Sequence, residues 1–98
     1  MQRLDKQYLE CLRREWVGGG GIKGIGVPLK RGTNIEKINE WVLNLLNKEE
    51  FSEHESSIVE CLWHGMNCDI PPGATRLVRE ELVRILLMKV EDPNRDVV

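Results

Sequence analysis

The clearest hydrophobic pattern in the chain is a stripe of apolar residues between Thr33 and Asn47. These residues recur at steps of three and four, which places them on one face of a helix. They are Ile35, Ile38, Trp41, Val42, Leu45 and Leu46. Thr33 followed by Glu36 is typical of a capping box, in which each side chain bonds the backbone N–H of the other residue. The pattern therefore predicts an amphipathic helix over about 34–47, whose apolar face needs cover from the rest of the chain.

The same spacing predicts three further helices. They cover about 3–17, 53–64 and 74–90. Ser52 with Glu55 indicates a capping box at the start of the third of the four helices, and Gly65 suits the left-handed residue just past its end. The last helix is apolar almost all round in its C-terminal half, a pattern typical of a helix that is enclosed or shared with another chain.

A glycine-rich segment, 18–32, interrupts the helical pattern. Seven of its fifteen residues are glycine, so ordering it costs backbone entropy. Apolar residues alternate from Ile25 to Leu29, which indicates an extended segment or a short β-element, confined to an edge by Pro28. We expect a long loop between the first and second helices, with a short β-element as an option within it.

These elements predict an all-α fold: one four-helix bundle-like domain over 1–91, with loop 18–32 within it and a flexible tail over 92–98. A chain of 98 residues can bury one modest core. No apolar run approaches the ~18–20 residues that span a bilayer, so we expect a soluble protein. The N-terminus has no secretory pattern, and three widely spaced cysteines form no disulfide framework. This favours reduced thiols in the cytoplasm or nucleus.

The excess of apolar helix surface predicts a non-enzymatic binding or regulatory protein. Such a protein would use helix faces to form a homodimer or to dock on a larger protein. The candidate interface residues are Trp63, Met66, Val83, Leu87 and Met88. Trp63 lies at the margin of the third helix's apolar face by the 100° step, where it would anchor a partner.

The alternative hypothesis is a phosphate or nucleic-acid site in the loop. Lys23, Lys30 and Arg31 lie there among glycines, whose backbone N–H groups can hold an anion. No Gly-Lys-Ser/Thr motif occurs, and a helix rather than a strand precedes the glycines, which argues against nucleotide-binding loops. The layout of a short helix, a Gly- and Lys-containing loop and three helices is similar in outline to retroviral matrix domains. That resemblance implies a basic loop used at membranes or on nucleic acid.

A third hypothesis is a zinc-stabilised module. Cys61, His64 and Cys68 carry zinc's preferred ligand atoms within a short window, with His54 about two turns earlier on the same helix. One helix rarely wraps four ligands around a metal, and we expect both histidines to lie on the polar flank in water. No nucleophile, base and pocket come together in the pattern, so we expect no enzyme activity and no cofactor.

Overall fold

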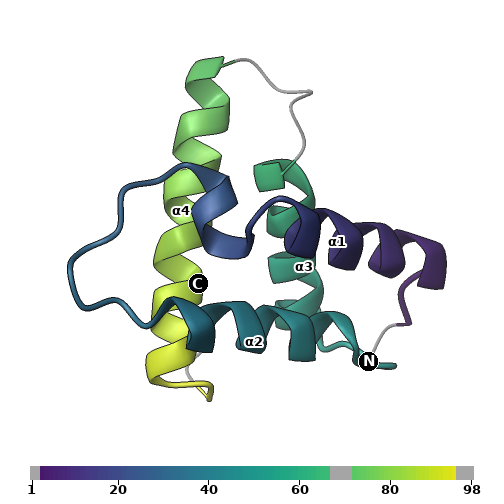
Figure 1. Ribbon diagram of the computed structural model, residues 1–98. Coiled ribbons are helices and arrows are strands. Elements are labelled where there is room, and N and C mark those ends of the chain that lie inside the picture. The colour runs from purple at the N-terminus through teal and green to yellow at the C-terminus, as the bar shows by residue number, and fades with distance from the viewer. Residues whose placement is uncertain (1–2, 67–71, 95–98) are drawn as a thin grey trace.

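Five helical elements make up the described part of the chain (Figure 1). The computed structural model describes residues 3–66 and 72–94, without the side chains of 72–77. The elements are α1 (Lys6–Gly18), the 3-10 helix η1 (Gly21–Ile25), α2 (Ile35–Leu46), α3 (Glu53–Met66) and α4 (Pro72–Glu91). The prediction of an all-α fold is confirmed for these residues.

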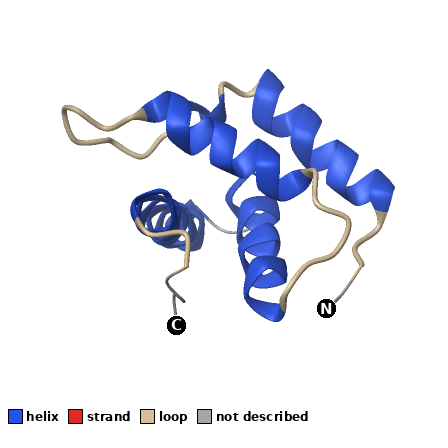
Figure 2. Ribbon diagram, turned by 90° about the horizontal axis from the view of Figure 1, so that it is seen from below, coloured by secondary structure: helices blue, strands red, loops and turns tan. Residues whose placement is uncertain are grey.

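The four α-helices form two antiparallel pairs that cross each other (Figures 1 and 2). α1 and α2 run side by side in opposite directions, and so do α3 and α4. α4 packs mainly on α3 and also on α2, while α1 contacts α3. The radius of gyration is 12.7 Å, as expected for one compact domain of this length. None of the described helices is long and apolar enough to cross a bilayer.

The helix starts test the two predicted capping boxes. At α3 the capping box is confirmed: the Ser52 N–H donates to Glu55 Oε1 (3.0 Å) and the Glu55 N–H donates to Ser52 Oγ (3.1 Å). At α2 the predicted box is wrong, because the helix starts one residue later. Asn34 is the N-cap there and accepts from the Lys37 N–H (3.1 Å). Thr33 instead bonds back to the Lys30 carbonyl through its hydroxyl (2.7 Å).

The end of α3 also differs from the prediction. Gly65 lies inside the helix, is buried, and has no positive φ, so it is not the left-handed residue past the end. Leu82 of α4 packs directly over it, since a Cβ on Gly65 would lie 2.7 Å from the Leu82 Cδ2 atom. The missing side chain therefore lets α3 and α4 approach closely. Arg79 Nε donates to the Gly65 carbonyl (2.9 Å) at the same place.

The chain ends and the α3–α4 connection are only partly covered. The proline-containing connection 67–71 and most of the predicted tail, 95–98, lie outside the described residues. The beginning of the tail is described. It turns back after α4, where the Asp92 N–H donates to the Met88 carbonyl (2.8 Å) and the Asn94 N–H to Asp92 Oδ1 (3.2 Å).

The glycine-rich segment contains a compact 3-10 turn, and residues 18–32 form no strand, so the β-element considered as an option does not occur there. The η1 turn buries Ile22 and Ile25 completely or nearly so, between α1 and α2. Gly21 has φ +64°, and a Cβ there would collide with the Asn39 side chain. Asn39 Oδ1 in turn accepts from the Ile22 N–H (2.9 Å), which ties η1 to α2. The segment is therefore part of the core at its first half.

One apolar cluster at the meeting point of both helix pairs forms the core. Its largest fully buried members are Trp16, Phe51, Leu12, Ile22, Ile38, Leu46, Ile58, Leu62, Leu82, Leu86, Val42 and Val59. Trp16 is 1% exposed, and its indole Nε1 has no hydrogen-bond partner in the described structure. Across the first pair, Arg13 Nη1 donates to the Leu46 carbonyl (2.7 Å), which caps the end of α2 from α1.

The close approach within η1 predicts a strong effect of one methyl group. A Cβ on Gly24 would collide with the Gly19 carbonyl oxygen, a backbone atom that cannot rotate away. We expect Gly24→Ala to lower the free energy of unfolding by about 2 kcal/mol, the typical cost of overpacking. Urea denaturation followed by tryptophan fluorescence would measure it.

Gly18→Ala is the matched control, because a Cβ there meets nothing within 4 Å and Gly18 lies in the last turn of α1. It should leave stability unchanged or raise it slightly through helix propensity. Equal effects of the two substitutions would contradict the packing of η1 described above.

Candidate functional site

The three cations of the glycine-rich segment surround one hollow. Lys23 comes from η1, and Lys30 and Arg31 come from the loop that follows. The hollow has a volume of about 410 Å³, and Val27, Leu29 and Ile35 supply its apolar lining. Figures 1 and 2 show that the loop between η1 and α2 projects from the body of the protein. The fold thus brings together the residues that the sequence named as an anion site.

Local turns give this loop its shape. Gly26 and Gly32 have positive φ values of 81° and 91°, which marks a sharp turn at each end. Near the second turn, the Thr33 N–H (3.2 Å) and hydroxyl (2.7 Å) both donate to the Lys30 carbonyl. The apolar side chains of Val27 and Leu29 are half-buried, whereas all three cations are exposed. We call Lys23 and residues 26–33 the basic loop.

The basic loop carries no internal counter-charge. From Trp16 to Ile35 the sequence contains three basic residues and no acidic one. Within the described residues, Lys23, Lys30 and Arg31 take part in no ion pair. The positive potential here is therefore local, since the whole chain carries a formal net charge of −2.

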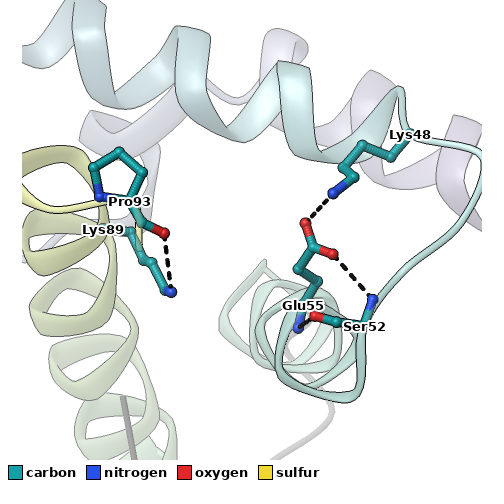
Figure 3. A network of polar contacts seen from close by, with 5 residues as sticks. All are labelled: Lys48, Ser52, Glu55, Lys89 and Pro93. Carbon is teal, nitrogen blue, oxygen red and sulfur yellow. Dashed lines mark hydrogen bonds and ion pairs between the residues drawn. The ribbon is translucent and has the colours of Figure 1, made fainter. Parts of the chain in front are cut away.

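A second hollow lies between α2, the start of α3 and the end of α4. Its volume is about 550 Å³. On one side Glu55 accepts from Lys48 Nζ and from the Ser52 N–H, and on the other Lys89 Nζ donates to the Pro93 carbonyl (3.4 Å), as Figure 3 shows. We call this hollow the Lys89 cleft.

Sequence reasoning missed Lys89. It is 4% exposed, the one charged residue that is buried in the described part of the chain. A signal for it exists, because Leu82, Ile85, Leu86 and Lys89 follow one another at steps of three and one, and thus share a helix face. A search for apolar residues at helical spacing passes over Lys89, because lysine is not counted as apolar.

His54 also differs from what we expected. His64 is exposed, with its Nε2 3.7 Å from Glu60 Oε1. His54 lines the Lys89 cleft instead, and its Nε2 is buried without a hydrogen-bond partner. The expectation that both histidines lie in water is therefore wrong for His54.

The predicted protein-interface residues occupy different environments. Trp63 and Met66 on α3 are half-buried. The Trp63 ring packs on Tyr8 of α1, with ring centroids 5.3 Å apart and an angle of 46° between the planes. Burial and the nearby Glu60 carboxylate raise the pKa of Tyr8, so its hydroxyl stays protonated.

On α4 the three candidates diverge further. Val83 is 5% exposed and belongs to the core, whereas Leu87 is 40% exposed. Met88 is half-buried, and its sulfur accepts from Arg84 Nη1 (3.1 Å). Only Leu87 and Val17 are large apolar residues that the described structure leaves exposed.

The candidate zinc ligands lie in different surroundings. Cys61 is half-buried, and burial together with the Glu60 and Glu81 charges raises the pKa of its thiol. A raised pKa disfavours the thiolate that zinc or a nucleophilic mechanism needs. Cys68 lies outside the described residues. Among those described, no group of three His, Cys, Asp or Glu residues is placed to hold a metal, and the zinc hypothesis stays a prediction.

Comparison with known proteins finds no family model, no curated protein and no solved structure that matches this chain. The similarity in outline to retroviral matrix domains therefore stays a prediction.

The Lys48–Glu55–Ser52 contacts predict a pH-dependent contribution to stability. Burial raises the pKa of Glu55, but the hydrogen bonds from Lys48 and Ser52 and the Lys48 charge lower it by more, so it lies below 4.5. A carboxylate with a lowered folded-state pKa stabilises the fold above its unfolded pKa, and this is lost as the pH falls through the folded value. Glu55→Gln should lower the free energy of unfolding at pH 7 by about 1 kcal/mol.

Urea melts at a series of pH values would record this, and the difference between Glu55→Gln and the unaltered protein should shrink as the pH falls through the lowered folded-state pKa of Glu55. Glu53→Gln is the control, since Glu53 lies in the same first turn, is exposed, and has no ion pair in the described structure. It should cost only a few tenths of a kcal/mol. A Glu53→Gln effect as large as that of Glu55→Gln would contradict this account.

Proposed function

We propose that this protein is a small non-enzymatic binding protein that holds the phosphate backbone of a nucleic acid in its basic loop. The single observation that carries the proposal is the gathering of Lys23, Lys30 and Arg31 around one hollow without an acidic partner. Lysine and arginine without counter-charges are the groups that neutralise phosphates and release their counterions.

The shape of the loop favours a nucleic acid over a membrane surface. Its larger apolar side chains, Val27 and Leu29, are half-buried and line the hollow, so they are not presented for insertion into lipid. Three charges alone hold a protein only weakly on an anionic membrane, because each basic residue near the surface contributes about 1 kcal/mol. Exposed lysine and arginine side chains around one hollow instead suit contacts to the phosphates of a nucleic-acid backbone.

The loop also lacks groups that read bases. It contains no aromatic residue for stacking, and no Asn or Gln lies between Gly18 and Thr33. Contacts to phosphates position a nucleic acid but carry no sequence information. The proposed binding is therefore independent of sequence and sensitive to salt.

Binding to a fluorescein-labelled single-stranded oligonucleotide, followed by anisotropy, tests the proposal. If three phosphates are neutralised, the logarithm of the binding constant should fall with the logarithm of salt concentration at a slope of about −2. The triple substitution Lys23→Gln, Lys30→Gln and Arg31→Gln should abolish binding between about 50 and 200 mM salt.

The control removes three charges that do not line the hollow. Arg3, Lys6 and Arg14 are exposed and absent from its lining, and their conversion to glutamine should leave most of the affinity intact. Equal losses in both triple variants would mean that only net charge matters. Binding to phosphatidylserine vesicles but not to the oligonucleotide would reassign the loop to a membrane surface.

A second candidate function is self-association or docking on a protein through α4. The observation in its favour is Leu87, a large apolar side chain on α4 that is 40% exposed. Met88 beside it is half-buried and would widen such a contact. In this proposal Trp63 and Met66 act as packing residues more than as anchors, and Val83 supports α4 from within the core. The cytoplasmic or nuclear location stays part of the proposal.

Sedimentation equilibrium tests this second candidate. We expect a weak homodimer with a Kd of about 0.1 mM, because one exposed leucine and its surroundings bury little area. Leu87→Glu should make the protein monomeric. Val17→Glu changes an exposed apolar residue of α1 in the same way and should leave the homodimer intact. A monomer at all concentrations would remove the homodimer.

A further inference from the structure

The Lys89 cleft has the size and composition of a small-molecule site. Its volume of about 550 Å³ falls within the range of ligand pockets. Side chains from three helices line it, so its shape depends on the whole fold and not on one loop. Trp41, Leu45 and Ile58 supply apolar wall, and the charged lining residues are Lys48, Glu55 and Lys89.

The charge of Lys89 is buried without a counter-charge. An ammonium has three N–H donors, and Lys89 Nζ uses one of them on a single acceptor, the Pro93 carbonyl at 3.4 Å. No carboxylate lies within ion-pair distance of Lys89 in the described structure. The C-terminal end of α4 offers partial negative charge only. A buried charge in this state is unusual, because burial without a partner is costly.

The nearest candidate for a partner is already engaged. Glu55 also lines the cleft, but its Oε2 accepts from Lys48 Nζ and its Oε1 from the Ser52 N–H (3.0 Å). Figure 3 shows this network on α3 and the adjoining turn, with Lys89 apart from it on α4. Lys48 and Lys89 line the cleft with one carboxylate, that of Glu55, so its lysines outnumber its carboxylates by one.

A second polar group in the cleft also lacks a partner. His54 Nε2 is buried and makes no hydrogen bond in the described structure. Buried polar atoms are nearly always hydrogen-bonded, so an unpaired imidazole nitrogen and an underused ammonium around one hollow point to a polar ligand group between them. A single excess charge suits a monoanion, and the Glu55 carboxylate would repel a dianion.

We propose that the Lys89 cleft binds a small organic monocarboxylate with an apolar body. The ligand carboxylate accepts from Lys89 Nζ, and the apolar body lies against Trp41 and Ile58. This site is separate from the basic loop, which is lined by other residues, so it neither requires nor supports nucleic-acid binding.

Titration of the protein with 3-phenylpropionate, followed by 1H–15N correlation spectra, tests the proposal. The expected result is saturable shifts of the Trp41 indole signal and of the end of α4. The neutral isostere 3-phenylpropanamide should bind at least about tenfold more weakly, because it cannot pair with the ammonium. Lys89→Met keeps the length of the side chain but removes its charge, and it should weaken binding of 3-phenylpropionate at least about tenfold.

Lys37→Met is the matched control, since Lys37 is exposed on α2 and does not line the cleft. It should bind 3-phenylpropionate as the unaltered protein does. If Lys89→Met does not fold, the comparison of carboxylate with amide on the unaltered protein decides the matter. Equal binding of acid and amide would overturn the proposal, and so would the absence of cleft shifts with both 3-phenylpropionate and octanoate at about 10 mM.

Discussion

The architecture depends on the close approach of backbone to backbone within the glycine-rich segment. Gly24 lies so near the Gly19 carbonyl, and Gly21 so near Asn39, that neither position has room for a side chain. This contact folds the segment into η1 and carries two isoleucines into the space between α1 and α2. Without this close packing, the apolar faces of α1 and α2 would lose the two isoleucines that cover part of them. The basic loop would also no longer start from a fixed position.

The same constraint explains why the loop after η1 projects. Once η1 is held against α1 and α2, the chain must still travel from Ile25 to the start of α2 at Ile35. It does so as an extended excursion with a glycine turn at each end. The buried η1 turn thus holds the exposed, positively charged basic loop in place. Binding loops are commonly positioned by a scaffold in this way.

Periodicity predicted the four α-helices well because each carries apolar residues at helical spacing, most of which the fold covers. The Ser52–Glu55 capping box was also predictable, since its two bonds are local and need no tertiary partner. The α2 cap was missed between two adjacent candidates, because Asn34 and not Thr33 accepts from the Lys37 N–H. Gly65 was missed because a tertiary contact with Leu82 decided its role, which is helix packing rather than helix termination. The compact η1 could not be predicted from glycine content. Glycines indicate a backbone with high conformational freedom, but they do not indicate the packing contacts that fix its conformation.

Of the two candidate sites, the sequence predicted the one built from neighbouring residues and missed the one built by the tertiary fold. Lys23, Lys30 and Arg31 could be named from composition, since they lie within nine residues of one another, and the fold then arranged them around one hollow. The Lys89 cleft could not be named, because its residues come from three helices distant in the sequence. Phe51 is a parallel case in the core: it lies in a polar turn with no periodic neighbours, yet it is fully buried.

The pairing of consecutive helices has a consequence for how the chain reaches its native state. Each antiparallel pair joins helices that are consecutive in the sequence, although residues 19–34 separate α1 from α2, so the contacts within a pair span less of the chain than the contacts between the pairs. The α1–α3 and α2–α4 contacts unite segments that lie further apart in the sequence. We expect the meeting of the two helix pairs to carry the larger loss of chain entropy during folding, since its contacts span more of the chain.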